Sequence, residues 1–312
     1  MTAVDGISFD IDKGETVGIV GESGSGKTMT ALSLLRLVPD PGKITSGKIL
    51  FGDRDVIHMS DEDIREFRGS DVSMIFQDPM TSLNPVLKVG FQVEEAMAAH
   101  RRFNNKQSRD RVVPMLQRVR IPAAAQRVND FPHQFSGGMR QRVMIAMGLS
   151  NEPSLLIADE PTTALDVTVQ ASIIELLRDL NREMGAAVIL ITHNLSVVAS
   201  LCQRVIVMYA GRIVEEGPTR QIFKNPQHPY TWSLLRSLPR ADDKGHHKLL
   251  SISGLPPDLS NMPPGCKFHP RCKFRIDKCF VDEPELEDVG DGHQARCWVL
   301  MKNVPDPEAV VK

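Results

Sequence analysis

Short runs of consecutive apolar residues alternate along this chain with segments whose apolar residues recur every three or four positions. The runs Thr16–Val20, 155–158 and Ala187–Ile191 have the length of buried strands. Between the last two, apolar residues recur at helical spacing over about residues 169–184. Because buried strands that alternate with amphipathic helices are typical of a largely parallel sheet, the pattern predicts an α/β fold.

The middle and the end of the chain differ from this pattern. Helical periodicity replaces the strand signal over about residues 86–150, which predicts a helical insertion within the α/β domain. A strand over 204–208, a turn at Ala210-Gly211-Arg212 and a return over 213–215 predict a hairpin. Proline pairs and weak periodicity beyond residue 238 predict a loop-rich extension. We therefore divide the chain into residues 1–238 and 239–312.

The bulk composition narrows the function classes. The 312 residues are 41% apolar and 24% charged, which is ordinary for a globular protein. The formal net charge of -2 supplies no excess of basic residues for a nucleic-acid backbone, so nucleic acid is not an expected partner. We see no secretory signal and no membrane-spanning run, and expect a cytosolic chain whose membrane association is peripheral.

A glycine-rich motif lies between the first predicted strand and a helix predicted over 28–37. Such a loop curls backbone N–H groups around phosphate oxygens, and the helix N-terminus adds a positive dipole. Within it, Lys27 would reach the outer phosphates and Thr28 would bind Mg²⁺. A chance Gly/Ser turn is the alternative, which the flanking strand and helix disfavour. The motif consists of Gly21, Glu22, Ser23, Gly24, Ser25, Gly26, Lys27 and Thr28.

Two carboxylates end the apolar strand over 155–158. Asp159 and Glu160 are thereby placed at the carboxyl edge of the sheet, where open α/β folds bind their ligands. Asp159 would hold Mg²⁺ through water, and Glu160 would polarise the attacking water. A solvated acidic pair is the alternative, which the nearby phosphate-loop motif disfavours.

A second helix start in the chain is suited to phosphate. Ser136 resembles an N-cap, and Gly137 and Gly138 would let a phosphate approach the exposed amides of the helix that follows. Ser-Gly-Gly followed about 20 residues later by the Asp-Glu strand end resembles the signature of ATP-binding-cassette ATPases. Phe135 and Met139 replace the usual Leu and Gln at the edges of that signature.

Other motifs resemble those of the same family in the expected order. Gln77, in Phe-Gln-Asp-Pro, resembles the glutamine that contacts Mg²⁺ and water. Asp166, in Ala-Leu-Asp, resembles the loop that crosses between subunits, and His193 resembles the histidine that contacts the terminal phosphate. The resemblance implies a P-loop fold with an antiparallel β subdomain. It also implies that ATP lies between the phosphate loop of one subunit and the Ser-Gly-Gly of another.

Four of the five cysteines are clustered near the end of the chain. Cys266, Cys272, Cys279 and Cys297 could hold zinc or a [4Fe–4S] cluster, and free structural cysteines remain an alternative. Their surroundings resemble the C-terminal extension of oligopeptide and dipeptide importer ATPases. Some members of that branch carry an iron–sulfur cluster, so the resemblance favours Fe–S over Zn²⁺. Cys202 is expected to be a buried core residue.

The start of the chain departs from the family pattern. Relatives usually have an earlier strand with an aromatic residue that stacks on adenine, and no residue here matches it. This favours a start codon further upstream over weak adenine binding. Phe9 is not assigned to that role, because its position fits a buried strand residue.

These features predict an ATP-hydrolysing subunit of a membrane importer, for which the family branch implies di- or oligopeptides. The implied partners are a second cassette ATPase, two transmembrane permeases and, indirectly, an extracytoplasmic solute-binding protein. The implied location is the cytoplasmic face of the inner membrane. Alternatives are a soluble cassette ATPase acting as a nucleotide switch, an importer for nickel, opines or glutathione, and a metal-sensing module in which ATP binding is secondary.

Overall fold

The computed structural model describes residues 1–77, 82–100, 103–163, 165–237 and 252–311. The chain forms two compact units. The first, here called the outer unit, combines Met1–Phe9, Val17–Thr30 and Thr192–Lys312. The second, the central unit, combines Asp10–Thr16 and Ala31–Ile191. Each unit is described by itself below.

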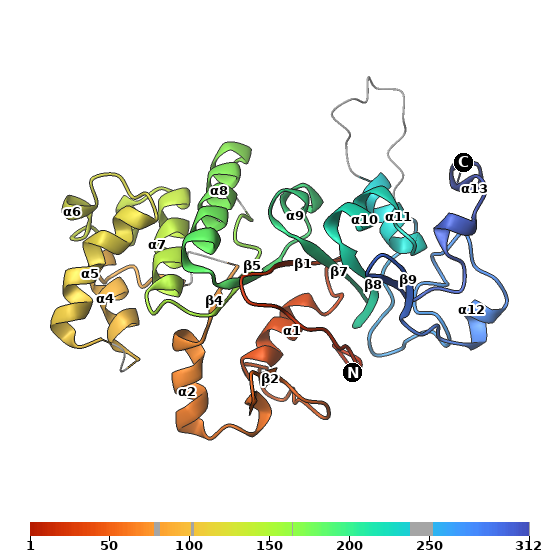
Figure 1. Ribbon diagram of the computed structural model, residues 1–312, viewed down its shortest axis with the longest axis horizontal. Coiled ribbons are helices and arrows are strands. Elements are labelled where there is room, and N and C mark those ends of the chain that lie inside the picture. The colour runs from red at the N-terminus through yellow and green to blue at the C-terminus, as the bar shows by residue number, and fades with distance from the viewer. Residues whose placement is uncertain (78–81, 101–102, 164, 238–251, 312) are drawn as a thin grey trace. The chain divides into compact units, whose positions relative to one another are not determined.

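The outer unit is built on a mixed sheet (Figure 1). Strand β1 (Thr16–Val20), fully buried as its apolar run predicts, pairs in parallel with β7 (Arg204–Tyr209). The chain then reverses into β8 (Arg212–Pro218), which is antiparallel to β7. Its helices include the start of α1 (Lys27–Leu34), as well as α9 (Leu195–Leu201), α10 (Thr219–Lys224), α11 (Pro229–Arg236), α12 (Lys278–Val281) and α13 (Pro307–Val311).

The predicted hairpin is confirmed at the turn between β7 and β8. Both turn residues have positive φ, 49° at Ala210 and 80° at Gly211. Two consecutive residues of positive φ give a turn whose twist matches that of the paired strands. The Gly211 N–H also donates to the Ser25 carbonyl at 3.0 Å, so the turn supports the glycine-rich loop that follows β1.

The central unit contains a parallel sheet in the order β4 (Val72–Ile75), β5 (Leu155–Asp159) and β6 (Ala187–Ile191). Helix α8 (Val167–Met184) connects β5 to β6 and buries the apolar face that its periodicity predicts. A separate two-stranded antiparallel sheet joins β2 (Leu50–Phe51) and β3 (Arg54–Asp55). The α/β fold and the small antiparallel sheet expected from the sequence are thus confirmed.

The segment predicted to be helical contains a group of mutually packed helices, visible together in Figure 1. Leu116 and Met97 are fully buried between them, which explains the helical spacing of the apolar residues. These helices are α4 (Val89–Ala98), α5 (Asn105–Arg118), α6 (Ala124–Arg127) and α7 (Gly137–Leu149), and α2 (Asp61–Ser70) precedes them.

The C-terminal extension, described from residue 252 onward, is part of the outer unit. Its β10 (His293–Ala295) adds to the edge of β8 in antiparallel pairing, and β9 (Glu287–Gly290) pairs with β10. Trp232, Phe274 and Met301 form a small apolar cluster in the same unit. Weak periodicity did predict a loop-rich segment, but it gave no indication of strand addition. The predicted boundary at residues 238 and 239 lies outside the described residues.

Two single-residue expectations have opposite outcomes. Cys202 is 7% exposed, as expected of a core residue, and burial raises the pKa of its thiol to about 12. The expectation for Phe9 was wrong, because this residue is in no strand and is only half-buried. Across the described part of the chain, no helix combines the length and apolar character needed to cross a membrane.

Candidate functional site

The phosphate-loop motif runs from the end of β1 to the first turn of α1. Lys27 begins this helix and is buried, and its ammonium donates to the carbonyls of Gly21 at 2.8 Å and Glu22 at 2.9 Å. The loop therefore wraps around its own lysine. Ser23, Gly24 and Thr28 are exposed, which leaves the outer side of the loop accessible.

The loop glycines are needed for backbone geometry and close approach. Gly24 and Gly26 have φ of 78° and 100°, which L-residues with side chains rarely adopt. A Cβ on Gly21 would lie 2.2 Å from the Met208 carbonyl oxygen, and one on Gly26 would lie 2.6 Å from the Ala3 carbonyl oxygen. The glycine pattern read from the sequence thus has a steric cause in this unit.

The carboxylate pair at the end of β5 has contrasting surroundings. Asp159 is the last residue of the strand and is 3% exposed. Glu160 is half-buried, has φ of 46°, and accepts hydrogen bonds from the Gln77 amide at 3.2 Å and the Thr163 hydroxyl at 2.7 Å. A left-handed backbone at a residue with a side chain costs about 1–3 kcal/mol and is typical of functional positions. The structure therefore brings Gln77 and Glu160 together.

The Ser-Gly-Gly motif begins α7 as predicted. Ser136 is the N-cap, and its hydroxyl accepts from the Met139 N–H at 3.3 Å. Ser136 and Gly137 are exposed, so this helix start is accessible. Gly138 has an additional packing role, because a Cβ there would lie 2.5 Å from a methyl group of Val169.

The remaining predicted site residues lie at exposed positions. Asp166 caps α8 by accepting from the Val169 N–H at 2.9 Å. His193 follows β6 and is exposed. Ala164, two residues before Asp166, and the Asp78-Pro79 that follow Gln77 lie outside the described residues. The inter-subunit role of Asp166 and the phosphate contact of His193 stay predictions.

The four clustered cysteines are all free thiols. Burial raises the pKa of Cys266, Cys272 and Cys297, and the neighbouring cysteines of the cluster raise it further. The Cys266 N–H also donates to the Cys279 carbonyl at 3.0 Å, which joins two of the four at the backbone. Within the ranges described, no three or more His, Cys, Asp or Glu side chains are grouped to hold a metal ion.

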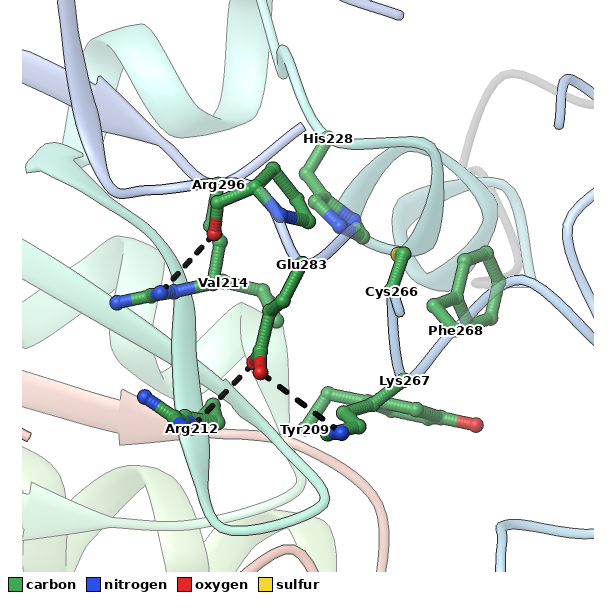
Figure 2. Close-up of a pocket in the computed structure, with 10 residues that line it drawn as sticks. Tyr209, Arg212, Val214, His228, Cys266, Lys267, Phe268, Glu283 and Arg296 are labelled. Carbon is green, nitrogen blue, oxygen red and sulfur yellow. Dashed lines mark hydrogen bonds and ion pairs between the residues drawn. The ribbon is translucent and has the colours of Figure 1, made fainter. Parts of the chain in front are cut away.

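A small pocket lies between part of the extension and β8 (Figure 2). Figure 2 shows Glu283 directed toward Arg212 and Lys267, and these ion pairs measure 3.3 and 3.7 Å. The pocket has room for about one water molecule. Its size and its internally paired charges are those of a structural contact rather than of a substrate site.

Sequence reasoning missed three polar contacts, one at the predicted site residue Glu160 and two at Glu22, which lies within the phosphate-loop motif. The Thr163 hydroxyl holds Glu160, the Tyr230 hydroxyl accepts from the Glu22 N–H at 2.8 Å, and the Arg271 guanidinium binds the Glu22 carboxylate. The last two partners are 208 and 249 residues away from Glu22 in the chain. The only local signal was the position of Arg271 directly before Cys272, which did not point to the loop.

Comparisons with known proteins agree with this geometry. Residues 4–163 match the ABC transporter family, and residues 214–279 match the C-terminal region of oligopeptide/dipeptide transporters. The oligopeptide transport ATP-binding protein OppD of Bacillus subtilis (strain 168) is 49% identical over 99% of this chain and 87% of its own length. The dipeptide transport ATP-binding protein DppD of Escherichia coli (strain K12) is 49% identical over 98% of this chain and 93% of its own length.

Solved structures give the same assignment. The dimeric ATP-binding cassette MJ0796, in a post-hydrolysis state with ADP and Pi, has a TM-score of 0.60 and 30% identity over 70% of this chain and 91% of its own. The protein cbiO1 of Clostridium perfringens, part of an ABC transporter complex, has a TM-score of 0.63 and 32% identity over 71% of this chain and 84% of its own.

The strand, phosphate loop and helix, together with the carboxylate strand end and the capped Ser-Gly-Gly helix, define a P-loop ATPase of the cassette type. This chain belongs to the ATPases of the ABC transporter family, and it carries the oligopeptide/dipeptide transporter C-terminal region.

Proposed function

We propose that this chain powers a membrane importer for di- or oligopeptides from the cytoplasmic face of the inner membrane. The observation that carries the proposal is its near-full-length similarity, at about half identity, to oligopeptide and dipeptide transport ATP-binding proteins. The match of residues 214–279 to the C-terminal region of oligopeptide/dipeptide transporters adds support. The proposed partners are a second ABC ATPase subunit, two permeases and, indirectly, an extracytoplasmic solute-binding protein.

For the nucleotide, we assign the phosphates of ATP to the loop from Gly21 to Thr28. Lys27 would bind the outer phosphates with its ammonium, and the dipole at the start of α1 favours their negative charge. Phosphoryl transfer requires mainly positioning and charge stabilisation, which this loop can provide. The exposed outer side of the loop is consistent with this assignment.

For catalysis, we assign the orientation of the attacking water to Glu160. Its hydrogen bonds from Gln77 and Thr163 hold the carboxylate, and its strained backbone is the kind found at functional positions. His193 would contact the terminal phosphate. Thr28, Gln77 and Asp159 would hold Mg²⁺, since their oxygens are the hard ligands that this ion prefers, and the ion would neutralise phosphate charge.

We further propose that ATP is shared between two subunits. The capped start of α7 at Ser136, Gly137 and Gly138, of which the first two are exposed, suits a phosphate of the partner's nucleotide. Asp166 would lie at the same interface. The related cassette MJ0796 was solved as a dimer with ADP and Pi, which supports this arrangement. Unchanged ATPase activity after combined replacement of Ser136 and Gly137 would contradict it.

For the extension, we propose that Cys266, Cys272, Cys279 and Cys297 bind a [4Fe–4S] cluster, with Zn²⁺ as the alternative. The donor set fits, because four thiolates are ligands for both. The described side chains are not grouped for a metal, so binding requires the thiols to turn toward a common centre. Iron, sulfide and zinc analysis of anaerobically purified protein distinguishes the two, and stoichiometric zinc would refute the cluster.

Uptake assays test the transport proposal. A strain that lacks this gene should fail to import a labelled dipeptide or oligopeptide. Wild-type protein should restore uptake, and Glu160→Gln should not. Restored uptake of nickel, an opine or glutathione in place of peptide would change the substrate class and keep the transport function. If the chain is purified from cells and no permease is bound to it, that result would favour a soluble nucleotide switch.

A further inference from the structure

Glu22, inside the phosphate loop, is held at three different points. Its N–H donates to the Tyr230 hydroxyl at 2.8 Å, and its carbonyl accepts from the Lys27 ammonium at 2.9 Å. Its carboxylate is bound by both terminal nitrogens of Arg271, at 2.5 and 3.0 Å. A bidentate pair of this kind fixes the orientation of both groups. The position of Glu22 is therefore held partly by Tyr230 and Arg271, which lie outside the loop.

Arg271 belongs to the cysteine-bearing segment of the extension. Its side chain is 5% exposed, its Nε donates to the Ser253 carbonyl at 3.1 Å, and one terminal nitrogen lies 3.4 Å from the Tyr209 hydroxyl. It directly precedes Cys272, and Phe268 packs edge-on against Tyr209 with ring centroids 5.2 Å apart. The guanidinium is charged, because arginine is not deprotonated in proteins.

The negative charge of Glu22 would oppose the binding of phosphate, and Arg271 neutralises this charge. A carboxylate inside a loop that binds a triphosphate repels the ligand, and this repulsion grows where solvent screening is weak. Glu22 is 25% exposed, so water screens its charge only in part. The buried guanidinium neutralises the carboxylate and also turns it toward the extension.

We propose that Arg271 is a positioning residue of the nucleotide site, which holds and neutralises Glu22 so that the phosphate loop accepts ATP. The extension would then complete the phosphate-binding loop of its own subunit. This inference rests on the proposed assignment of ATP phosphates to the loop from Gly21 to Thr28.

The test measures MgATP binding to the full-length protein by calorimetry. Arg271→Ala should weaken ATP binding about tenfold, the scale of a lost charge-assisted hydrogen bond. Glu22→Gln is the reference background, because it removes the carboxylate that Arg271 neutralises. In that background Arg271→Ala, the double variant, should change ATP affinity by no more than about twofold, since no unpaired carboxylate is left. A merely structural role of Arg271 would give no such rescue.

Steady-state kinetics give a second readout. Arg271→Ala should raise KM for ATP and leave kcat within about twofold, because the pair affects binding rather than the chemical step. Arg271→Gln repeats the measurement if the alanine variant is poorly folded. Equal affinities for wild type, Arg271→Ala and the double variant would overturn the proposal, as would an equal loss of affinity from Arg271→Ala in the wild-type and Glu22→Gln backgrounds.

Two controls separate this proposal from the assignment of the loop. Glu283→Gln removes another ion pair between the extension and β8, with Arg212, and should leave ATP affinity unchanged. Equal weakening by Glu283→Gln would mean a general loss of the extension, and would also overturn the proposal. Lys27→Ala should abolish binding. If it does so while Arg271→Ala has no effect, the positioning role fails and the loop assignment stands; if Lys27→Ala binds normally, the loop assignment itself fails.

Discussion

The phosphate loop and the C-terminal extension are both irregular, but they obtain their shape in different ways. The loop is short, and its course follows from its own glycines with positive φ between a strand and a helix. The extension has little regular structure and depends on partners far away in the chain, such as β8 and Glu22. A loop of the first kind can be recognised from local sequence, whereas one of the second kind cannot.

The dependence of the extension on distant partners also affects stability, and Glu215 is the residue where this is seen. Its side chain is fully buried in β8 and accepts hydrogen bonds from the Gln227 N–H at 2.5 Å and the His228 N–H at 3.0 Å. It also contacts His293 of β10 at 2.7 Å. One carboxylate therefore joins the β8 edge to the chain before α11 and to the extension.

The largest expected effect is accordingly a loss of stability from Glu215→Ala. Removing one partner of a buried polar network costs about 3–5 kcal/mol. The free energy of unfolding, measured by chemical denaturation, should fall by that amount. The exposed Glu287→Ala of β9 is the matched control and should change it by less than about 0.5 kcal/mol. Equal losses of unfolding free energy in the two variants would show that the buried carboxylate stabilises the protein no more than an exposed one.

The next effect concerns chemistry and should leave stability almost unchanged. Glu160→Gln should keep ATP binding and reduce turnover at least about a hundredfold, the scale lost when a positioned catalytic group is removed. Glu183→Gln, which affects only a surface ion pair with Arg118, is the control and should turn over normally. Near-normal hydrolysis by Glu160→Gln would refute the role of this carboxylate.

A pH effect should follow from the buried histidine beside the extension. Burial, aided by the positive charge of Arg296, lowers the pKa of His228 to about 3 from its ordinary 6.5. As the pH falls from 6.5 toward 3, the unfolded chain takes up a proton at His228 that the native protein does not. Stability is therefore complete above this window and is lost as the pH falls through it.

The measurement compares wild type with His228→Asn, which keeps an acceptor for the N-cap of α11. Between about pH 7 and pH 5, wild type should lose about 2 kcal/mol more of its free energy of unfolding than the variant. Parallel pH profiles would show that His228 is not the group responsible.

The smallest expected effect distinguishes the phosphate loop from the extension by their influence on ATP binding. Gly24 in the loop and Gly292 in the extension have φ of 78° and 68°, and a Cβ on either would meet no neighbour within 4 Å. Alanine should therefore cost about 1–2 kcal/mol of stability at each position, from backbone strain alone. Only Gly24→Ala should also weaken ATP binding. A similar change in Gly292→Ala would indicate that strain anywhere in the outer unit affects the nucleotide.

The regular elements could be predicted because they follow from local periodicity. The strands at Thr16–Val20 and Ala187–Ile191 begin and end where the apolar runs do, and α8 starts two residues before its predicted start. The hairpin at Ala210 and Gly211 was recognisable by its glycine between two strands. Phe9 was misassigned because an apolar residue in a short segment does not by itself define a strand.

The sequence by itself determined the phosphate loop, the carboxylate strand end and the Ser-Gly-Gly helix start, because spacing along a few residues sets backbone geometry there. Only the tertiary structure decided that Gln77 reaches Glu160, and that Tyr230 and Arg271 hold Glu22. These contacts join residues 83 to 249 positions apart. Such polar pairs leave no periodic trace in a sequence, since each needs only one suitable side chain at one place in the folded chain.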